Sequence, residues 1–445
     1  MSKKEILQAP KGMHDILPAD QPYWQFILKK ARALLEDYGF EKIDTPVIEY
    51  SLLFTRSIGG ATDIVEKEMY SFKTKGGDEL ALRPELTAPI ARAYIEHGMH
   101  TWPHPIQFWF FGPVFRHDNP QAGRYRQFHQ IDVETLGDEN AATDAQLIFV
   151  AYKILESLGL KNLVVKINSI GCPLCRPQYL KALKDYYRSR AKKICAKCKG
   201  RLKANGLRVL DCEEEQCQAV SKDAPQIVDF LDADCKAHFK NVLEFMDELK
   251  IPYLLDSHLV RGLDYYTRTV FEIWPEAPTP KAVEVPTTNV GKKPDTNTNQ
   301  FAICSGGRYD KLIHGLGGPK TPAAGWAMGV ERVIMVFKEA GLVAPITRPL
   351  PKIFIAQLGE IAKRKTLALF EEFRKIGISA KTSLGRDSIK SQLRIANRLG
   401  IKYTLIIGQK EAIDGTVILR EMDSGVQETV PLDKILDTVK TRLKS

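Results

Sequence analysis

The sequence has no run of about 18 or more apolar residues, so it holds no segment typical of a transmembrane helix. Its basic beginning, residues 1–15, is not followed by an apolar stretch, which excludes the pattern of a secretory signal peptide. We therefore expect the protein to avoid membranes and to work in the cytoplasm. Disulfides are rare in that compartment, so they are not the expected state of its eight cysteines.

The chain has 445 residues, of which 44% are apolar and 27% charged, and this is typical of a globular protein with two or three domains. Its net charge of +10 is unevenly distributed. Residues 172–222 contain 13 Lys and Arg against 5 Asp and Glu, and residues 351–445 contain 18 against 11. Two basic regions favour contact with a large polyanion such as a nucleic acid. A basic surface that only aids solubility is the alternative.

Residues 107–137 predict two antiparallel strands around which the rest of the chain is organised. The first strand, 107–116, is rich in Phe, and the second, 127–136, alternates in a period of two. The loop between them carries Pro120 and Gly123, which favour a turn. The residues expected on one face of the second strand are Phe128, Gln130, Asp132 and Glu134.

The charges of this strand pair indicate a binding site. Arg116 ends the first strand, and Arg124 and Arg126 end the loop, so three guanidinium groups can converge. The planar fork of arginine suits phosphate or carboxylate. Because Gln130 and Glu134 share a face, the pattern indicates a nucleotide site beside a site for a small polar substrate. An exposed hairpin with solvated charges is the alternative interpretation.

The elements predicted before this pair are a helix over 22–38, a strand over 41–50, a hairpin over 72–82 and a helix over 88–97. Pro46 cannot donate a ladder hydrogen bond, so its strand should lie at an edge, a bulge or a partner interface. Residues 83–87 lead into the last of these helices. Among them, Glu85 either stabilises the helix N-terminus through the helix dipole or binds an amine.

The elements predicted after the pair are a helix over 141–158, strands over 163–168, 253–255, 260–273 and 301–309, and a strand that runs into a buried helix at about Gly329. Residues 172–252 are basic, helical and cysteine-rich, which indicates an inserted module. Residues 275–299 have low complexity and no apolar period, so they predict a loop.

Beyond a linker at Leu350-Pro351, strands and helices alternate. The predicted order is strand 352–357, helix 360–376, strand 378–382, helix 388–399, strands 403–407 and 415–419, and helix 432–443. This alternation predicts a small α/β domain with a mainly parallel sheet.

The cysteines of the insert are spaced like metal ligands. Two C-x2-C pairs are separated by 19 residues, and two further cysteines follow. In a cytoplasmic protein this spacing fits a tetrahedral structural zinc held by four of six side chains. The six candidates are Cys172, Cys175, Cys195, Cys198, Cys212 and Cys217. Cys235 and Cys304 are predicted to be ordinary buried residues.

Four stretches resemble the class II aminoacyl-tRNA synthetases, and two of them narrow the resemblance to the histidyl-tRNA synthetase family. The segment that ends at Pro46 resembles motif 1, which forms the dimer; FRHDNPQAGRYRQFHQ resembles motif 2 and GWAMGVER motif 3. VRGLDYY (260–266) and CSGGRYD (304–310) are similar to the histidine-specific motifs. KGMHDILP matches the opening of the family, so the resemblance spans nearly the whole chain.

The resemblance implies a fold and an activity. The implied fold is an α+β catalytic domain on an antiparallel sheet, an inserted helical domain and a C-terminal anticodon-binding domain. The expected boundaries are 1–168 and 253–345 for the two parts of the catalytic core, 169–252 for the insert and 350–445 for the last domain. The implied enzyme is a homodimeric histidine–tRNA ligase that uses ATP with Mg²⁺, L-histidine and tRNA(His), with the insert lying against the acceptor stem.

The resemblance also implies roles for four arginines. Arg116 would hold the α-phosphate and the substrate carboxylate, and Arg124 and Arg332 would hold the other phosphates of ATP. Arg261 would be a fixed cationic catalyst, which makes Arg116 and Arg261 the expected catalytic residues. Such chemistry depends on positioning and charge neutralisation. Taken alone, Arg261 would be interpreted as an ordinary salt-bridged arginine.

For histidine, the implied site reads both imidazole nitrogens. Glu134 would accept from one ring N–H, and Tyr266 or a neighbour would engage the other nitrogen; such a site rejects analogues by roughly 10⁴-fold. Tyr265 and Tyr266 are predicted to alternate in a strand, one facing the site and one the core, and core packing is the alternative role of Tyr265. Tyr309 would close the pocket. The expected histidine-binding residues are Glu85, Leu86, Thr87, Gln130, Glu134, Arg261, Tyr265, Tyr266 and Tyr309.

Two other functions are compatible with part of the sequence. A synthetase-like regulatory subunit of ATP phosphoribosyltransferase would be non-catalytic, but such a subunit typically lacks the anticodon domain and has eroded motifs. Another class II synthetase is disfavoured by VRGLDYY.

Overall fold

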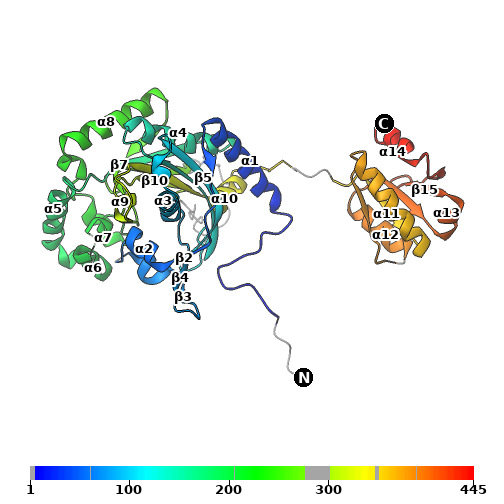
Figure 1. The fold of residues 1–445 in the computed structure, drawn as a ribbon, viewed down its shortest axis with the longest axis horizontal. Helices are drawn as coiled ribbons and strands as arrows, with labels where there is room; N and C mark the ends of the chain where they lie inside the picture. Colours follow the sequence, from blue (N-terminus) through cyan, green and yellow to red (C-terminus); the bar gives the residue numbers. More distant parts are fainter. Residues whose placement is uncertain are drawn as a thin grey trace, which may run out of the picture. The chain divides into compact units, whose positions relative to one another are not determined.

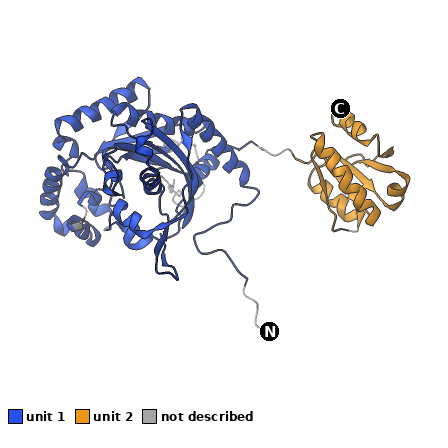
Figure 2. Ribbon diagram, in the orientation of Figure 1, with its two compact units in different colours: residues 1–345 blue, residues 346–445 orange. Residues whose placement is uncertain are grey.

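The computed structural model describes residues 6–60, 62–204, 206–275, 301–345, 350–386 and 388–444. Of the loop predicted over 275–299, only Pro275 lies within the described residues. The chain forms two compact units, residues 1–345 and 346–445 (Figure 2). None of the described helices is long and apolar enough to cross a lipid bilayer.

The first unit is built on an eight-stranded sheet (Figure 1). Its strands, in spatial order, are β1 (Glu41–Lys42), β5 (Ile106–Phe115), β6 (Gln127–Leu136), β11 (Ala323–Gly329), β10 (Cys304–Arg308), β9 (Thr267–Pro275), β7 (Leu163–Ser169) and β8 (Tyr253–Leu255). Every pair from β5 to β7 is antiparallel, and only the edge strands β1 and β8 pair in parallel. The central strand pair predicted from the sequence is therefore confirmed.

Helices pack on the sheet through apolar stripes. The helices of the main core cluster are α1 (Gln21–Asp37), α4 (Ala141–Ser157), α8 (Ala233–Glu248) and α10 (Val330–Glu339). In α1, for example, Ile27, Ala31 and Leu35 recur at helical spacing and are fully buried. A second cluster covers other sheet residues with α3 (Thr87–Glu96) and the insert.

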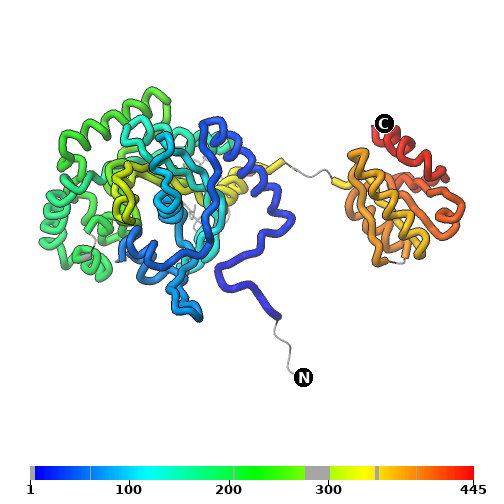
Figure 3. The backbone as a smooth tube through the Cα atoms, in the orientation of Figure 1, coloured from blue at the N-terminus to red at the C-terminus, as the bar shows by residue number. Residues whose placement is uncertain are grey.

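Between β7 and β8 the described residues fold as helices, turns and loops, and they form a group of helices beside the sheet (green in Figure 3). The helices of this segment before α8 are α5 (Arg176–Arg188), α6 (Ala196–Ala204) and α7 (Glu215–Ser221). The helical character expected of the insert is present. The domain boundaries drawn from the sequence stay predictions.

The strand predicted over residues 41–50 is two strands in different sheets. β1 joins the large sheet, and β2 (Ile48–Tyr50) pairs with β4 (Glu79–Leu82), which also pairs with β3 (Ser71–Lys73). Pro46 lies in the break, where it has no N–H to continue a ladder. The hairpin formed by β3 and β4 was correctly predicted.

The strand predicted over residues 260–273 begins only at Thr267. Arg268, inside β9, has φ of 51° where the pairing of β9 with β10 shifts register, so even the first residues of the strand are irregular. In addition, the backbone oxygen of Tyr266 accepts a hydrogen bond from the Arg176 side chain at 2.7 Å instead of a strand neighbour. Residues 261–266 therefore form turns, which changes the placement of both tyrosines in the site.

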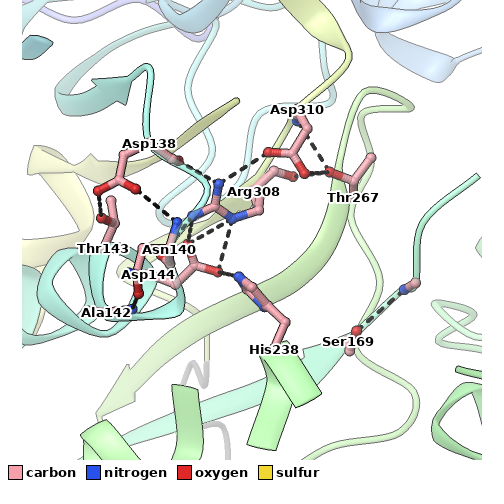
Figure 4. A network of polar contacts seen from close by, with 11 residues as sticks. Asp138, Asn140, Ala142, Thr143, Asp144, Ser169, His238, Thr267, Arg308 and Asp310 are labelled. Atoms are coloured by element: carbon pink, nitrogen blue, oxygen red, sulfur yellow. Dashed lines mark hydrogen bonds and ion pairs between the residues drawn. The ribbon is translucent and has the colours of Figure 1, made fainter. Parts of the chain in front are cut away.

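Arg308, at the end of β10, is fully buried in a network of charges (Figure 4). Its Nε donates to Asp144 Oδ1 of α4 at 2.9 Å, and its Nη1 lies 3.1 Å from Asp310 Oδ1. The guanidinium also donates to the backbone oxygens of Asp138 and Asn140, at 2.8 Å and 3.1 Å. All these partners are needed because a buried charge is costly without them. Arg308 thus joins the sheet to α4 and is a structural residue.

The second unit has a five-stranded mixed sheet. Its strands, in spatial order, are β13 (Ala380–Thr382), β12 (Ile353–Gln357), β14 (Tyr403–Ile407), β15 (Thr416–Glu421) and β16 (Gln427–Pro431). The first three are parallel and the last two pairs are antiparallel, so the sheet predicted to be mainly parallel is parallel in its first half only. Its helices are α11 (Glu360–Lys375), α12 (Ile389–Arg398), α13 (Gln409–Asp414) and α14 (Ile435–Lys444). The sequence did not predict β16, a largely polar edge strand, or the short α13.

Candidate active site

A cavity of about 730 Å³ opens in the first unit. Its wall includes side chains of β6, β10 and β11, the loop between β5 and β6, and residues 261–266. The insert contributes to the same wall through Arg201, Arg208 and Asp211. Segments far apart in the sequence therefore meet around one space that is large enough for a nucleotide and a small substrate.

All four arginines singled out from the sequence line this cavity: Arg116, Arg124, Arg261 and Arg332. The third arginine of the strand pair, Arg126, does not. Arg126 instead donates to the backbone oxygens of Asp118 and Lys11, at 3.2 Å and 3.4 Å. The expectation that Arg126 converges with Arg116 and Arg124 is therefore wrong, because Arg126 holds the N-terminal segment.

Arg116 is positioned by the chain around it. Its Nε donates to the backbone oxygen of Pro84 at 2.8 Å, and its guanidinium lies over the ring of Phe128 at 5.5 Å. Burial lowers the pKa of Arg116, although the charges of Glu68 and Glu85 oppose the shift. No carboxylate of the described residues forms an ion pair with Arg116, so its charge remains available to an anion.

Arg332 and Arg124 lie on the same side of the cavity. Arg332 donates to the backbone oxygens of Gly123 and Ala302, at 3.0 Å and 2.8 Å. Burial, together with the nearby charges of Arg124 and Arg116, lowers the pKa of Arg332 to about 10. Mutual repulsion among cations that share a cavity is relieved when an anion binds.

Arg261 reaches the cavity from the turn before β9. Its Nη1 forms an ion pair with Glu272 at 2.6 Å, and its Nη2 donates to Ser305 at 3.0 Å. Burial acts to lower the pKa of Arg261, but Tyr266 and Glu272 outweigh it and raise the pKa. Arg261 is therefore salt-bridged, as expected if it were an ordinary structural arginine. It is also held in place at the cavity wall.

In contrast to the arginines, the side chains on one face of β6 are hydrogen-bond acceptors. Gln130, Asp132 and Glu134 each have one buried oxygen that accepts no hydrogen bond from the described residues. Burial raises the pKa of Glu134 to about 7, and burial together with the charge of Glu134 raises the pKa of Asp132 well above its usual range. Unpaired buried acceptors are costly in a protein, so this face is suited to a ligand that brings N–H donors.

The neighbouring strand leaves room for Glu134. Gly325 of β11 is paired with Glu134, and a Cβ at Gly325 would lie impossibly close to the Glu134 carboxylate. Tyr309 donates its hydroxyl to the other oxygen of Glu134. Glu134 is thus fixed from two sides, although neither it nor Tyr309 lies in the lining of the main cavity.

Glu85 fulfils the structural role that its position predicts. Its carboxylate accepts from the backbone N–H groups of Thr87 and Ala88 at 2.8 Å each, at the start of α3. Burial raises the pKa of Glu85. Glu85 and Thr87 also line the cavity, whereas the side chain of Leu86 is buried in the hydrophobic core and does not reach it.

The two tyrosines do not alternate between site and core. Because they precede β9 and lie in turns, Tyr265 and Tyr266 both line the cavity, with ring centroids 4.7 Å apart. The Tyr265 hydroxyl donates to Glu85 at 3.4 Å, and the Tyr265 ring packs edge-on against Tyr309 at 5.6 Å. The predicted division between a site tyrosine and a core tyrosine is therefore wrong.

Both units of the chain match known protein families. Residues 12–333 match the family model described as "Histidyl-tRNA synthetase", and residues 352–442 match the "Anticodon binding domain" model. The chain belongs to the histidyl-tRNA synthetase family. Membership confirms the class II fold expected from the motifs and makes the chain an aminoacyl-tRNA ligase.

Relatives in the histidyl-tRNA synthetase family match over their whole length. The chain is 45% identical to the histidine–tRNA ligase of Dehalococcoides mccartyi over 438 residues, which is 98% of this chain and 100% of the relative. It is 41% identical to that of Caldicellulosiruptor bescii over 98% of this chain and 99% of the relative. The crystal structure of apo S. aureus histidyl-tRNA synthetase superposes with a TM-score of 0.75 at 34% identity, covering 98% of this chain and 100% of that one.

Some residues of the synthetase cavity had no role in the sequence prediction. Asp132 is the clearest, and the alternation that placed it between Gln130 and Glu134 on one face was a usable signal. Asp63 is another: its carboxylate forms ion pairs with Arg208 at 3.2 Å and Arg201 at 3.7 Å, across to the insert. No local sequence pattern predicts a contact between segments that are so distant in the sequence.

The cysteines of the insert form two clusters rather than one. In the first, the sulfurs of Cys195, Cys198, Cys212 and Cys217 all lie within 4.8 Å of one another. The second consists of Cys172, Cys175, Asp232 and Cys235 at the same limit. Cys235 is buried, as predicted, but the fold also brings it to a C-x2-C pair 60 residues away, which the sequence did not indicate.

Glu134→Gln is expected to lower kcat/KM for histidine about 10- to 100-fold, since a hydrogen bond to a charged group contributes about 1.5–3 kcal/mol. The pKa of Glu134 is raised to about 7, so protonation at lower pH removes the charged acceptor from the unaltered enzyme. The variant carries a neutral glutamine at every pH and does not titrate at this position. The advantage of the unaltered enzyme should therefore grow as pH rises through about 7. Initial rates across pH measure this ratio.

The ring of free histidine titrates in the same range, but it does so equally for both enzymes and cancels in the ratio. A ratio that stays constant from about pH 6 to about pH 8 contradicts an ionising Glu134 at the ring.

Proposed function

We propose that the protein activates L-histidine with ATP to histidyl-adenylate and then transfers the histidyl group to the 3′ end of tRNA(His). In the first step a carboxylate oxygen of histidine attacks the α-phosphorus of ATP, and the bond to pyrophosphate breaks. In the second step a hydroxyl of the terminal ribose attacks the histidyl carbonyl, and AMP leaves. The observation that carries the proposal is one cavity with a cationic wall that also includes Gln130 and Asp132, whose buried oxygens are unpaired and which share a face of β6 with Glu134.

The cationic wall suits a triphosphate. Arg116 and Arg261 neutralise the charge that develops at the α-phosphate, and Arg124 and Arg332 hold the outgoing phosphates. Arg116, Arg261 and Arg332 are fixed by hydrogen bonds to the chain, so little reorganisation is needed at the moment of reaction. ATP enters as its magnesium complex, which is part of the substrate.

The acceptor face suits the donors of histidine. The ionised Glu134 accepts from an imidazole N–H, and Tyr309 holds this carboxylate in place. Gln130, Glu85 and Thr87 surround the α-ammonium group. An amino acid without a ring N–H would leave buried acceptors unpaired, so the site discriminates by roughly 10⁴-fold or more.

The tRNA contacts fall to the basic regions. We assign the anticodon to the second unit, and the acceptor end to the insert, whose Arg201 and Arg208 reach the cavity wall. A homodimer is proposed because several large apolar side chains are exposed around β2 and β3. They are Val47, Ile48, Tyr50, Leu52 and Phe72. The cytoplasm supplies all of these substrates and is the proposed location.

A structural zinc is proposed for Cys195, Cys198, Cys212 and Cys217. The sulfurs of Cys195 and Cys212 are 3.9 Å apart, and backbone N–H groups donate to Cys217 Sγ at 3.2 Å and Cys195 Sγ at 3.4 Å. Zinc bound by thiolates at about 2.3 Å requires such spacings. The variant Cys198→Ala is expected to contain one zinc less per chain than the unaltered protein, and equal contents contradict this site.

Histidine-dependent exchange of pyrophosphate into ATP tests the proposed reaction. Exchange that requires histidine supports the ligase. The alternative, a regulatory subunit of ATP phosphoribosyltransferase, would give no exchange with any amino acid, and another class II synthetase would respond to a different amino acid. The complete arginine set in one cavity favours the ligase over the regulatory subunit.

A further inference from the structure

We propose that Cys172, Cys175, Asp232 and Cys235 form a second zinc site, at the root of the insert. This cluster is separate from the four-cysteine cluster and shares none of its residues. Three thiols and one carboxylate provide four potential ligands, the number that structural zinc takes. The proposal does not depend on the ligase activity, since it concerns how the insert is anchored.

The spacing of the donor atoms fits a tetrahedral ion. Cys175 Sγ lies 3.7 Å from Cys172 Sγ and 3.9 Å from Cys235 Sγ. Four ligands at about 2.3 Å from a central zinc are separated by about 3.8 Å in a regular tetrahedron. Asp232 Oδ2 completes the set at 3.0 Å from Cys172 Sγ. These distances are also too long for a disulfide, whose sulfurs are about 2.05 Å apart.

The backbone around the C-x2-C pair directs two N–H groups at the sulfurs. The N–H of Cys172 donates to Cys175 Sγ at 3.1 Å, and the N–H of Leu174 donates to Cys172 Sγ at 3.3 Å. The preceding residue is Gly171, with φ of 67°, and a Cβ there would meet Cys175 Sγ at 2.7 Å. The turn is thus shaped to bring both sulfurs to one point.

Asp232 serves two purposes with its two oxygens. Its Oδ1 accepts from the N–H of Cys235 at 2.7 Å and caps the N-terminus of α8, while Oδ2 faces Cys172. A cap alone uses one oxygen. The second oxygen accepts from the Cys172 thiol in the metal-free cluster and is placed to act as the fourth ligand once that proton leaves, and the half-buried Cys172 gives an ion access to the cluster.

The position of the cluster explains what the ion would do. Cys172 follows the end of β7, where the chain enters the insert, and Cys235 lies in the first turn of α8, by which it returns to β8. An ion between them ties the entry to the exit. Next to it, Arg176 donates to the backbone oxygen of Tyr266 at 2.7 Å, so the same anchor supports a wall of the cavity.

Metal analysis of the full-length protein, purified under reducing conditions without added chelator, tests the second site. Two zinc ions per chain are expected for the unaltered protein and one for Cys235→Ala. The matched control is Cys304→Ala, because Cys304 is the eighth cysteine, is buried and belongs to neither cluster. This control should retain two. Cys198→Ala should retain one, and the combination of Cys198→Ala with Cys235→Ala none.

Asp232→Asn separates ligation from folding, because asparagine retains the cap but loses the anionic ligand. A chelator should remove one of the two zinc ions of Asp232→Asn faster than it removes either ion of the unaltered protein. The thermal unfolding temperatures of the two zinc-loaded proteins should be similar. Substitution with Co²⁺ gives a second readout: the thiolate-to-cobalt absorption of Cys235→Ala should fall to that of one site.

One zinc in the unaltered protein, with no loss in Cys235→Ala, would overturn the second site, since the ion would then belong to the four-cysteine cluster. A protein with no zinc would overturn it as well. So would a stable disulfide between any two of Cys172, Cys175 and Cys235 in the reduced-purified protein, detected by mass spectrometry.

Discussion

Replacing Arg261 with glutamine is expected to lower kcat for histidyl-adenylate formation by about 10²- to 10³-fold, the effect of removing one fixed donor to a developing negative charge. The KM for histidine should change much less, because the guanidinium acts on the transition state. Arg261→Lys should recover only part of the rate, since lysine keeps the charge but lacks the planar fork. Histidine-dependent pyrophosphate exchange measures all three enzymes.

Glu272→Gln is the matched control for this experiment. It removes the ion pair at 2.6 Å but leaves Arg261 in the cavity, held by Ser305. If Arg261 acts on the substrate, Glu272→Gln should lose far less activity than Arg261→Gln. Equal losses in the two variants would mean that Arg261 matters only as the partner of Glu272, and the catalytic role would be wrong.

Arg308→Met is expected to destabilise the first unit by about 3–5 kcal/mol, because it leaves the buried Asp144 and the half-buried Asp310 without their cation. Adding Asp144→Asn to Arg308→Met should restore part of the loss by removing one of the stranded charges. The unfolding of this unit can be followed by tryptophan fluorescence. All five tryptophans lie in it: Trp24, Trp102, Trp109, Trp274 and Trp326.

Arg32→Met is the control for Arg308→Met, since Arg32 pairs with Glu36 on α1 with side chains 62% and 47% exposed. A surface pair of this kind contributes at most about 1 kcal/mol. Urea unfolding of both variants gives the comparison. A loss at Arg308 no larger than that at Arg32 would contradict the structural role of the buried network.

The strand pair at the centre of the catalytic unit was predictable because its signals are local. A period of two in residues 127–136 places Gln130 and Glu134 on one face, and a turn signal separates the strands. The arginines of the motifs were also placed correctly, with all four in one cavity. The class resemblance, rather than the spacing, joined Arg261 and Arg332 to this site.

The failures arose where distant segments decide the local structure. Nothing near Tyr266 shows that Arg176, from the insert, takes its backbone oxygen, and so the start of β9 was predicted too early. Cys235 stands alone in the sequence, so no C-x2-C spacing reveals that it joins Cys172 and Cys175. Arg126 was grouped with its neighbours because their charges are alike, whereas its contacts lie with the N-terminal segment.

A crystal structure with histidine and a non-hydrolysable ATP analogue is the most direct measurement of the central claim, which is that one cavity binds both substrates in reacting positions. The account predicts the imidazole at Glu134, the α-phosphate between Arg116 and Arg261, and the remaining phosphates at Arg124 and Arg332. An imidazole bound away from Glu134, or a triphosphate that contacts none of these arginines, would contradict it.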